Sequence, residues 1–189
     1  MKLPPIILAS VSPRRTELFK QLELEFAVVP SHTPEFYHED LTAGELSQLN
    51  AYRKSRHVAK QHPDSLVIGA DTLVSLGTRL YGKPANAEEA AGMLGELSGR
   101  THSVVTGVCL LHLRGHHQRV FSETSFVTFH PLSKGRIAAY LNQVDALDKA
   151  GAYAIQERGE LIVENVIGSF TNVVGLPLAR LREELLMWT

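Results

Sequence analysis

Two long strand-like segments joined by a short polar turn are the feature that most limits the possible folds of this chain. Residues 104–113 and 120–129 are rich in apolar and β-branched side chains, and the polar residues 114–117 between them are typical of a turn. The pair predicts a long hairpin. Elsewhere strand-like and helix-like segments alternate, which favours parallel strands. The combination predicts an α/β protein built on a mixed sheet.

The other segments supply shorter strands and the helices. Apolar or alternating runs predict strands at 6–9, 26–30, 66–70 and 161–167, and a hairpin around Gly77-Thr78. Helix signals are a Ser12 cap followed by Pro13, a capping box from Thr42 to Glu45 opening a helix to about His62, Asn86 with Glu89, a short helix at 137–141, and an amphipathic helix from near Pro177. Because no linker or repeat interrupts this order, we expect a single domain over residues 1–189.

The composition excludes several classes of function. The chain has 189 residues, of which 44% are hydrophobic and 21% charged, as in an ordinary globular protein. Nineteen Lys and Arg against twenty Asp and Glu give a net charge of -1, so no broad basic surface predicts binding to nucleic acid or to an anionic membrane. The single cysteine, Cys109, lies in an apolar run typical of a buried, unreactive thiol. With no targeting or membrane-spanning segment recognised, we expect a cytoplasmic protein.

The segment from Ser10 to Arg15 predicts an anion site. It connects the first predicted strand to a helix start, where unpaired N–H groups and the helix dipole favour a phosphate. Arg14 and Arg15 add two guanidinium groups, whose forked donors suit phosphate oxygens. An ordinary pair of solvated arginines on a surface helix is the alternative.

Further charged residues suggest chemistry at a phosphate. Asp71 ends the predicted buried strand 66–70, and such a carboxylate is unusual unless the strand end faces a crevice. Glu35, Lys54 and Lys83 each also fit a solvated loop, helix or turn charge. Together these residues offer donors for phosphates, hard oxygen ligands for Mg²⁺ or Mn²⁺, and a base for water. The sequence contains no zinc-type ligand spacing, dinucleotide glycine motif or P-loop.

Six segments, in this order, carry a resemblance that covers essentially the whole chain. They are Ser10-Val11-Ser12-Pro13-Arg14-Arg15, Gly69-Ala70-Asp71-Thr72, Gly82-Lys83-Pro84, residues 98–107, residues 148–156 and Asn172-Val173-Val174-Gly175-Leu176-Pro177. The chain thereby resembles the Maf family of nucleotide pyrophosphatases. That resemblance implies a twisted mixed sheet with flanking helices, in two lobes around a central cleft, similar to the inosine triphosphate pyrophosphatases.

The resemblance also implies an enzyme, a hydrolase that converts a nucleoside triphosphate to the monophosphate and pyrophosphate with Mg²⁺ or Mn²⁺. It implies that Asp71 accepts the proton of the water that attacks the α-phosphorus, and that Glu35 and Asp71 hold the metal. The residues implied to hold phosphates are Ser10, Arg14, Arg15, Lys54 and Lys83. A homodimer is a further expectation from the resemblance alone.

Three matched positions, Arg14, Thr72 and Gln156, resemble the subgroup that acts on dTTP and UTP, with modified pyrimidine nucleotides as further substrates. The Gln156 side chain can offer both a donor and an acceptor to a uracil or thymine edge. Two alternatives stay open: the same reaction on another base such as 7-methylguanosine triphosphate, and a nucleotide-binding regulator of septum formation without turnover. The discriminating feature is Asp71, because binding alone needs no base for water.

The chain also departs from the family pattern. Pro34 precedes Glu35 where an acidic residue is usual, which bears on metal placement, and Glu23 replaces a turn glycine. The loop at 36–40 is shorter than usual, which bears on the rim of the expected cleft.

Overall fold

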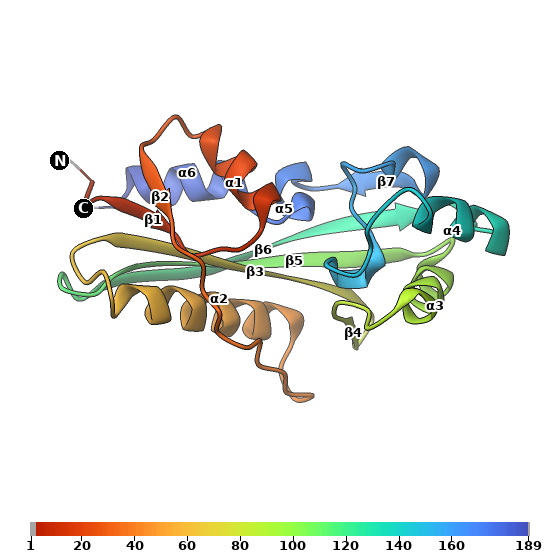
Figure 1. Ribbon diagram of the computed structural model, residues 1–189, viewed down its shortest axis with the longest axis horizontal. Helices are drawn as coiled ribbons and strands as arrows, with labels where there is room; N and C mark the ends of the chain where they lie inside the picture. The colour runs from red at the N-terminus through yellow and green to blue at the C-terminus, as the bar shows by residue number, and fades with distance from the viewer. Residues whose placement is uncertain (1–2, 189) are drawn as a thin grey trace. The chain divides into compact units, whose positions relative to one another are not determined.

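The computed structural model describes residues 3–188, and its strands form one mixed sheet. Within those residues seven strands pair in the order β2-β1-β3-β5-β6-β7, with β4 added to β3. The strands are β1 (Ile6–Leu8), β2 (Phe26–Val28), β3 (Leu66–Leu76), β4 (Arg79–Tyr81), β5 (Thr101–His112), β6 (His117–Phe129) and β7 (Val163–Ile167) (Figure 1). The helices are α1 (Pro13–Lys20), α2 (Ala43–Ala59), α3 (Ala87–Leu97), α4 (Lys134–Leu141), α5 (Phe170–Val174) and α6 (Leu178–Leu186), with short 3₁₀ turns η1 (Ala150–Ala152) and η2 (Gly159–Leu161).

The pairing directions confirm the predicted mixed sheet. β1 runs parallel to both β2 and β3, and its register aligns Leu8 with Val28 on one side and Ile68 on the other. β3 with β4 and β6 with β7 are antiparallel pairs. Gly77, at φ +60°, makes the tight turn of the β3–β4 hairpin, as its position in the sequence predicts.

The chain divides into two compact units, each with a hydrophobic core of its own. The first unit comprises residues up to 71, residues 106–123 and residues from 175 on, and the second comprises 72–105 and 124–174. Strands β3, β5 and β6 contribute residues to both units.

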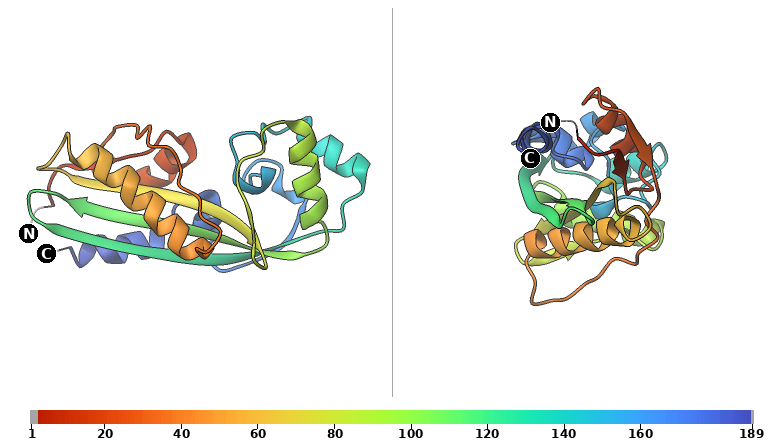
Figure 2. Two further views of the ribbon diagram at one scale, coloured as in Figure 1. Left: turned by 90° about the horizontal axis from the view of Figure 1, so that it is seen from below. Right: turned by 90° about the vertical axis from the view of Figure 1, so that its left-hand side faces the viewer.

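Helix α2 packs closely on the strands of the first unit. Its buried face, with Ala51 and Val58, forms a cluster with Val67 of β3 and Cys109 of β5. Two glycines permit this approach, because a Cβ on Gly69 would lie 2.5 Å from the Ser55 hydroxyl and one on Gly107 would lie 2.5 Å from the Gln48 nitrogen. Helix α2 covers one face of these strands, and α1 and α6 lie on the opposite face (Figures 1 and 2). Trp188, which follows α6, stacks on His117 of β6 with ring centroids 4.0 Å apart.

Gly107→Ala is expected to destabilise the protein because the clash is with helix backbone. The added methyl would lie 2.5 Å from both the Ser47 carbonyl oxygen and the Gln48 nitrogen, and neither atom can rotate away. We expect the free energy of unfolding to fall by about 3 kcal/mol. Urea denaturation measures it, with Gly92→Ala in α3, where a Cβ meets no atom within 4 Å, as the control. Equal midpoints for the two variants would contradict the close packing.

The second unit has a core rich in aromatic side chains. Helices α3 and α4 contribute Leu94, Leu97 and Tyr140, and the β6 residue Phe129 packs among them. His102 of β5 is buried in this cluster, edge-on to the rings of Phe129 and Tyr153, and its Nε2 lies 2.8 Å from the Tyr153 hydroxyl. Burial lowers the pKa of His102 from 6.5 to about 4, so the folded protein holds this ring neutral.

His102 is therefore expected to weaken the folded state in acid. Its pKa is lower in the folded than in the unfolded chain, so below pH 6.5 the unfolded chain binds more protons, and stability is lost as the pH falls toward 4. Between pH 7.5 and 4.5 the wild type should lose about 2 to 3 kcal/mol more unfolding free energy than His102→Gln. Urea titrations of both proteins over this range test it, and parallel pH dependences would contradict it.

Most predicted elements are present, with differences at particular residues. Thr42 and Glu45 form the predicted capping box, and Asn86 caps α3. Ser12 is the N-cap residue of α1, but its side chain makes no capping hydrogen bond. Its own N–H donates to the Ser10 hydroxyl at 3.1 Å. Helix α5 was not predicted. Cys109 is buried as expected, and burial raises the pKa of its thiol to about 12.

The prediction that Asp71 ends a strand was wrong. β3 continues through Asp71 and Thr72 to Leu76, because the buried carboxylate finds hydrogen-bond partners on α2 and the backbone ladder need not stop.

Among residues 3–188, no helix is long and apolar enough to span a membrane.

Candidate active site

Asp71 is the buried acidic residue around which the candidate site of the first unit is built. It lies in β3 three residues beyond Ile68, the partner of the last residue of β1. The Ala9 N–H donates to the Ile68 carbonyl at 2.8 Å, so the chain leaving β1 follows the stretch of β3 that leads to Asp71. Only 2% of Asp71 is exposed to solvent. Because water is excluded, the ionised form of this carboxylate must be stabilised by partners within the protein.

Lys54 of α2 is the cation that faces this carboxylate. Its Nζ lies 2.5 Å from Asp71 Oδ1 and 3.1 Å from Glu35 Oε1, so one ammonium group pairs with two carboxylates. The Lys54 side chain is 12% exposed, and that of Glu35 is 45% exposed. The arrangement places a buried and a half-exposed carboxylate on one cation.

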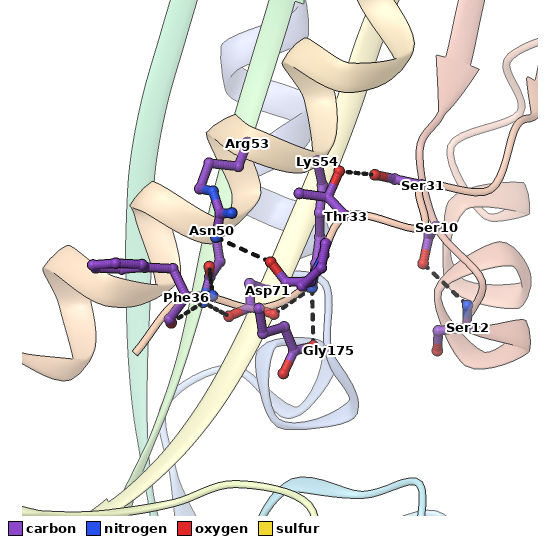
Figure 3. Close-up of polar contacts among 12 residues, drawn as sticks. Ser10, Ser12, Ser31, Thr33, Phe36, Asn50, Arg53, Lys54, Asp71 and Gly175 are labelled. Atoms are coloured by element: carbon purple, nitrogen blue, oxygen red, sulfur yellow. Dashed lines mark hydrogen bonds and ion pairs between the residues drawn. The ribbon is translucent and has the colours of Figure 1, made fainter. Parts of the chain in front are cut away.

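Asn50 holds the second oxygen of Asp71. Figure 3 shows Asn50 and Lys54, one helical turn apart on α2, both directed toward Asp71. The Asn50 Nδ2 donates to Asp71 Oδ2 at 3.1 Å, so each carboxylate oxygen accepts one hydrogen bond. An ionised carboxylate oxygen has about two acceptor sites, and each oxygen of Asp71 therefore retains capacity for a further donor such as water.

The loop that carries Glu35 is fixed to α2 at several points. The Phe36 N–H donates to Asn50 Oδ1 at 2.8 Å, and the Arg53 Nη1 donates to the Pro34 carbonyl at 3.0 Å. The Arg53 guanidinium also lies over the Phe36 ring, 5.6 Å from its centroid. Nearer the start of the loop, the hydroxyls of Ser31 and Thr33 are 2.9 Å apart (Figure 3). Pro34 thus supplies a carbonyl that anchors the loop.

Arg15 adds a second, partly buried cation. Its Nε donates to the Gly175 carbonyl at 2.8 Å, which ties the start of α1 to the segment before α6. Burial lowers the pKa of Arg15, and the charges of Asp71 and Glu35 oppose that change. The pKa of Asp71 is raised above its ordinary value, because burial and the charge of Glu35 outweigh the opposing effects of Lys54 and Arg15. These residues form one electrostatic cluster.

The structure brings Glu35, Lys54 and Asp71 into direct contact, and the charge of Arg15 acts on Asp71. The roles expected of these residues stay predictions. Ser10, which is buried, lies on the connection between β1 and α1, and Arg14 and Arg15 lie in the first turn of α1. Thr72, Lys83 and Gln156 belong to the second unit, where Gln156 and Lys83 are exposed. Their contact with a substrate stays a prediction.

Asn50, Arg53 and Phe36 are site residues that sequence reasoning missed. One signal was available for Asn50, because it stands four residues before Lys54 and such residues share a helix face. A polar residue on the face that also carries the buried Ala51 and Ser55 needs a partner. No sequence signal indicates that the partner would be the backbone of Phe36.

The donor set around Lys54 fits a small divalent cation. Glu35 and Asp71 reach the same ammonium group, and carboxylates are hard oxygen ligands of the kind that Mg²⁺ and Mn²⁺ prefer. Residues 3–188 contain no group of three or more His, Cys, Asp and Glu side chains that could hold a metal. Mg²⁺ commonly binds through one or two carboxylates together with substrate phosphates, and two carboxylates suffice for that mode.

The fold and the site define an α/β protein whose buried acid is paired with a lysine, and whose first helix begins with two arginines. The solved structure of the Staphylococcus aureus Ham1 protein has the same fold, with a TM-score of 0.55 over 98% of this chain and 100% of that one, at 19% identity. The family model described as "Maf-like protein" matches residues 5–188. The chain belongs to this family.

Curated relatives are similar over nearly their whole length. The dTTP/UTP pyrophosphatase of Myxococcus xanthus is 47% identical over 173 residues, which are 92% of this chain and 87% of that protein. The dTTP/UTP pyrophosphatase of a Geobacillus species is 46% identical over 175 residues, 93% of each.

Proposed function

We propose that this protein is a hydrolase that converts dTTP and UTP to the monophosphate and pyrophosphate. The observation that carries the proposal is Asp71, a buried carboxylate held by Lys54 beside a second carboxylate, Glu35. A site that only bound phosphates would be weakened by an acid in this place, whereas hydrolysis requires a base for water. The names of the similar proteins support the choice of substrates.

In the proposed reaction, a water oxygen attacks the α-phosphorus while the bond from this phosphorus to the α,β-bridging oxygen breaks. Asp71 takes the proton of the water, and pyrophosphate leaves with the electron pair of the broken bond. Lys54 and Asn50 fix the carboxylate so that its remaining acceptor positions are oriented. Positioning and charge stabilisation account for most of the catalysis in phosphoryl transfer.

The cations of the first unit neutralise the triphosphate. Arg15 donates through Nε to the Gly175 carbonyl, Arg14 precedes it in the first turn of α1, and Ser10 lies on the connection before this helix. The forked guanidinium groups suit phosphate oxygens. Glu35 and Asp71 would hold a divalent cation such as Mg²⁺ or Mn²⁺. When bound, that ion supplies additional positive charge for the phosphate oxygens.

The choice of base rests on Arg14, Thr72 and Gln156, the positions at which the sequence resembles the dTTP/UTP subgroup. Gln156 in the second unit is exposed, and its Nε2 lies 3.5 Å from Glu157 Oε1, at the limit of a hydrogen bond. Its amide can exchange this contact for the edge of a pyrimidine without loss of a buried bond.

We also propose that the protein acts in the cytoplasm and as a homodimer.

The proposal is tested by pyrophosphate release from a panel of nucleotides with Mg²⁺ or Mn²⁺. The panel contains dTTP, UTP, dCTP, GTP and 7-methylguanosine triphosphate. We expect the highest kcat/KM for dTTP and UTP, and no release without a divalent cation. Preference for the methylated purine would overturn the base choice, and binding of dTTP without any pyrophosphate release would overturn the reaction.

A further inference from the structure

Asn50 is a buried polar residue that the reaction above uses only as a neighbour of Asp71. It is 2% exposed and lies in the middle of α2, one helical turn before Lys54. A buried amide without partners would destabilise the fold, so the identity of its partners shows what this residue arranges. All of its partners lie in the first unit.

The Asn50 side chain connects two parts of the site that are distant in the sequence. Its Nδ2 donates to Asp71 Oδ2 at 3.1 Å and to the Phe36 carbonyl at 3.0 Å, and its Oδ1 accepts from the Phe36 N–H at 2.8 Å. Both amide hydrogens and the oxygen are therefore used. Figure 3 shows the amide between the Phe36 backbone and Asp71.

These three bonds permit only one orientation of the amide. If oxygen and nitrogen were exchanged, the NH₂ group would face the Phe36 N–H, and the oxygen would face both a carbonyl and a carboxylate. Because Phe36 directly follows Glu35, fixing both backbone groups of Phe36 also fixes the point from which Glu35 reaches Lys54.

We propose that Asn50 is a positioning residue. Its single side-chain amide fixes the position of the Asp71 carboxylate relative to the loop that carries Glu35. The inference rests on the proposed hydrolase function for its kinetic consequences, while the contacts themselves are independent of it. In this proposal Asn50 holds none of the reacting atoms itself. Its effect on the reaction is exerted through Asp71.

The proposal predicts a split between kcat and KM. In Asn50→Leu the carboxylate loses one donor and can rotate, so kcat for dTTP should fall about 50-fold, because misplacement by about 1 Å has effects of this order. The phosphate-binding cations are untouched. KM, and the Kd of non-hydrolysable α,β-imido-dUTP measured by calorimetry, should therefore stay within about threefold of the wild type.

A second variant separates the two functions of the amide. Asn50→Asp has the same shape and keeps an acceptor for the Phe36 N–H, but presents an oxygen instead of a donor to Asp71. Its kcat should fall as far as that of Asn50→Leu, while hydrogen exchange of the Phe36 amide stays slow. In Asn50→Leu the exchange of this amide should accelerate at least about tenfold, because its acceptor is gone. Asn142→Leu, which changes an exposed asparagine of the second unit, is the matched control and should behave as wild type.

A double-mutant cycle shows whether Asn50 acts through Asp71. If it does, Asn50→Leu should lower kcat by less than about threefold once Asp71→Asn is present. An equal loss in both backgrounds would overturn the proposal, as would an active wild type with Asn50→Asp and Asn50→Leu both within about twofold of its kcat. A Phe36 amide that stays protected in Asn50→Leu would also overturn it, and this readout needs no turnover. A wild type that releases no pyrophosphate would instead overturn the proposed function.

Discussion

Asp71→Asn is expected to lower kcat for dTTP about 1,000-fold, since loss of a general base has effects of this order. The variant keeps the size of the side chain. It removes the ability of residue 71 to take the proton of water and weakens it as a ligand for a divalent cation. The Lys54 ammonium retains Glu35 as a partner, so the fold should persist. Pyrophosphate release in the steady state measures the loss, and circular dichroism verifies the fold.

The matched control is Asp64→Asn. Asp64 is an exposed aspartate of the first unit, and its carboxylate pairs with Arg114. We assign Asp64 no part in the reaction. We expect it to retain wild-type kcat. Binding of α,β-imido-dUTP to Asp71→Asn, measured without a divalent cation, should remain within about threefold of wild type, because the Lys and Arg side chains are intact. Full turnover by Asp71→Asn would exclude this residue as the base.

Lys54→Met should produce the second largest effect, and it should affect both catalysis and stability. The change leaves the carboxylates of Asp71 and Glu35 without the ammonium that lies 2.5 Å from one and 3.1 Å from the other. We expect kcat/KM for dTTP to fall about 100-fold, as for removal of one stabilising charge from an active site. Because the pair is nearly buried, the free energy of unfolding should fall by about 3 kcal/mol.

Lys60→Met provides the comparison for Lys54→Met. Lys60 is the exposed C-cap residue of the same helix, so the variant makes the same chemical change outside the site. Its kcat/KM and urea midpoint should match those of the wild type. If Lys54→Met unfolds at the wild-type urea concentration and retains activity, the ion pairs described here do not support the site.

The local elements could be predicted from the sequence because their signals are local. The capping box at Thr42 and the Gly77 turn each depend on residues a few positions apart, and both are present as expected. The mixed sheet followed from the combination of a long hairpin with alternating elements. The extent of β3 did not follow, because the polar pair Asp71-Thr72 indicates a strand end unless one knows that α2 provides partners for the acid.

The site could be predicted only as a set of residue types. Asp71, Lys54, Glu35 and Arg15 were predicted, and they form one cluster. The hydrogen bonds that orient them were not predictable, since they join residues such as Asn50 and Phe36 through a backbone conformation that no spacing rule specifies. The capping bond expected of Ser12 is not formed, although Ser12 occupies the N-cap position that the sequence indicates.

Hydrolysis of dTTP in water enriched in ¹⁸O tests the central claim most directly. If Asp71 activates water for attack on the α-phosphorus, mass spectrometry should find one ¹⁸O atom in each dTMP and none in the pyrophosphate. Label in pyrophosphate, or orthophosphate and dTDP as the products, would place the attack at another phosphorus and contradict the account.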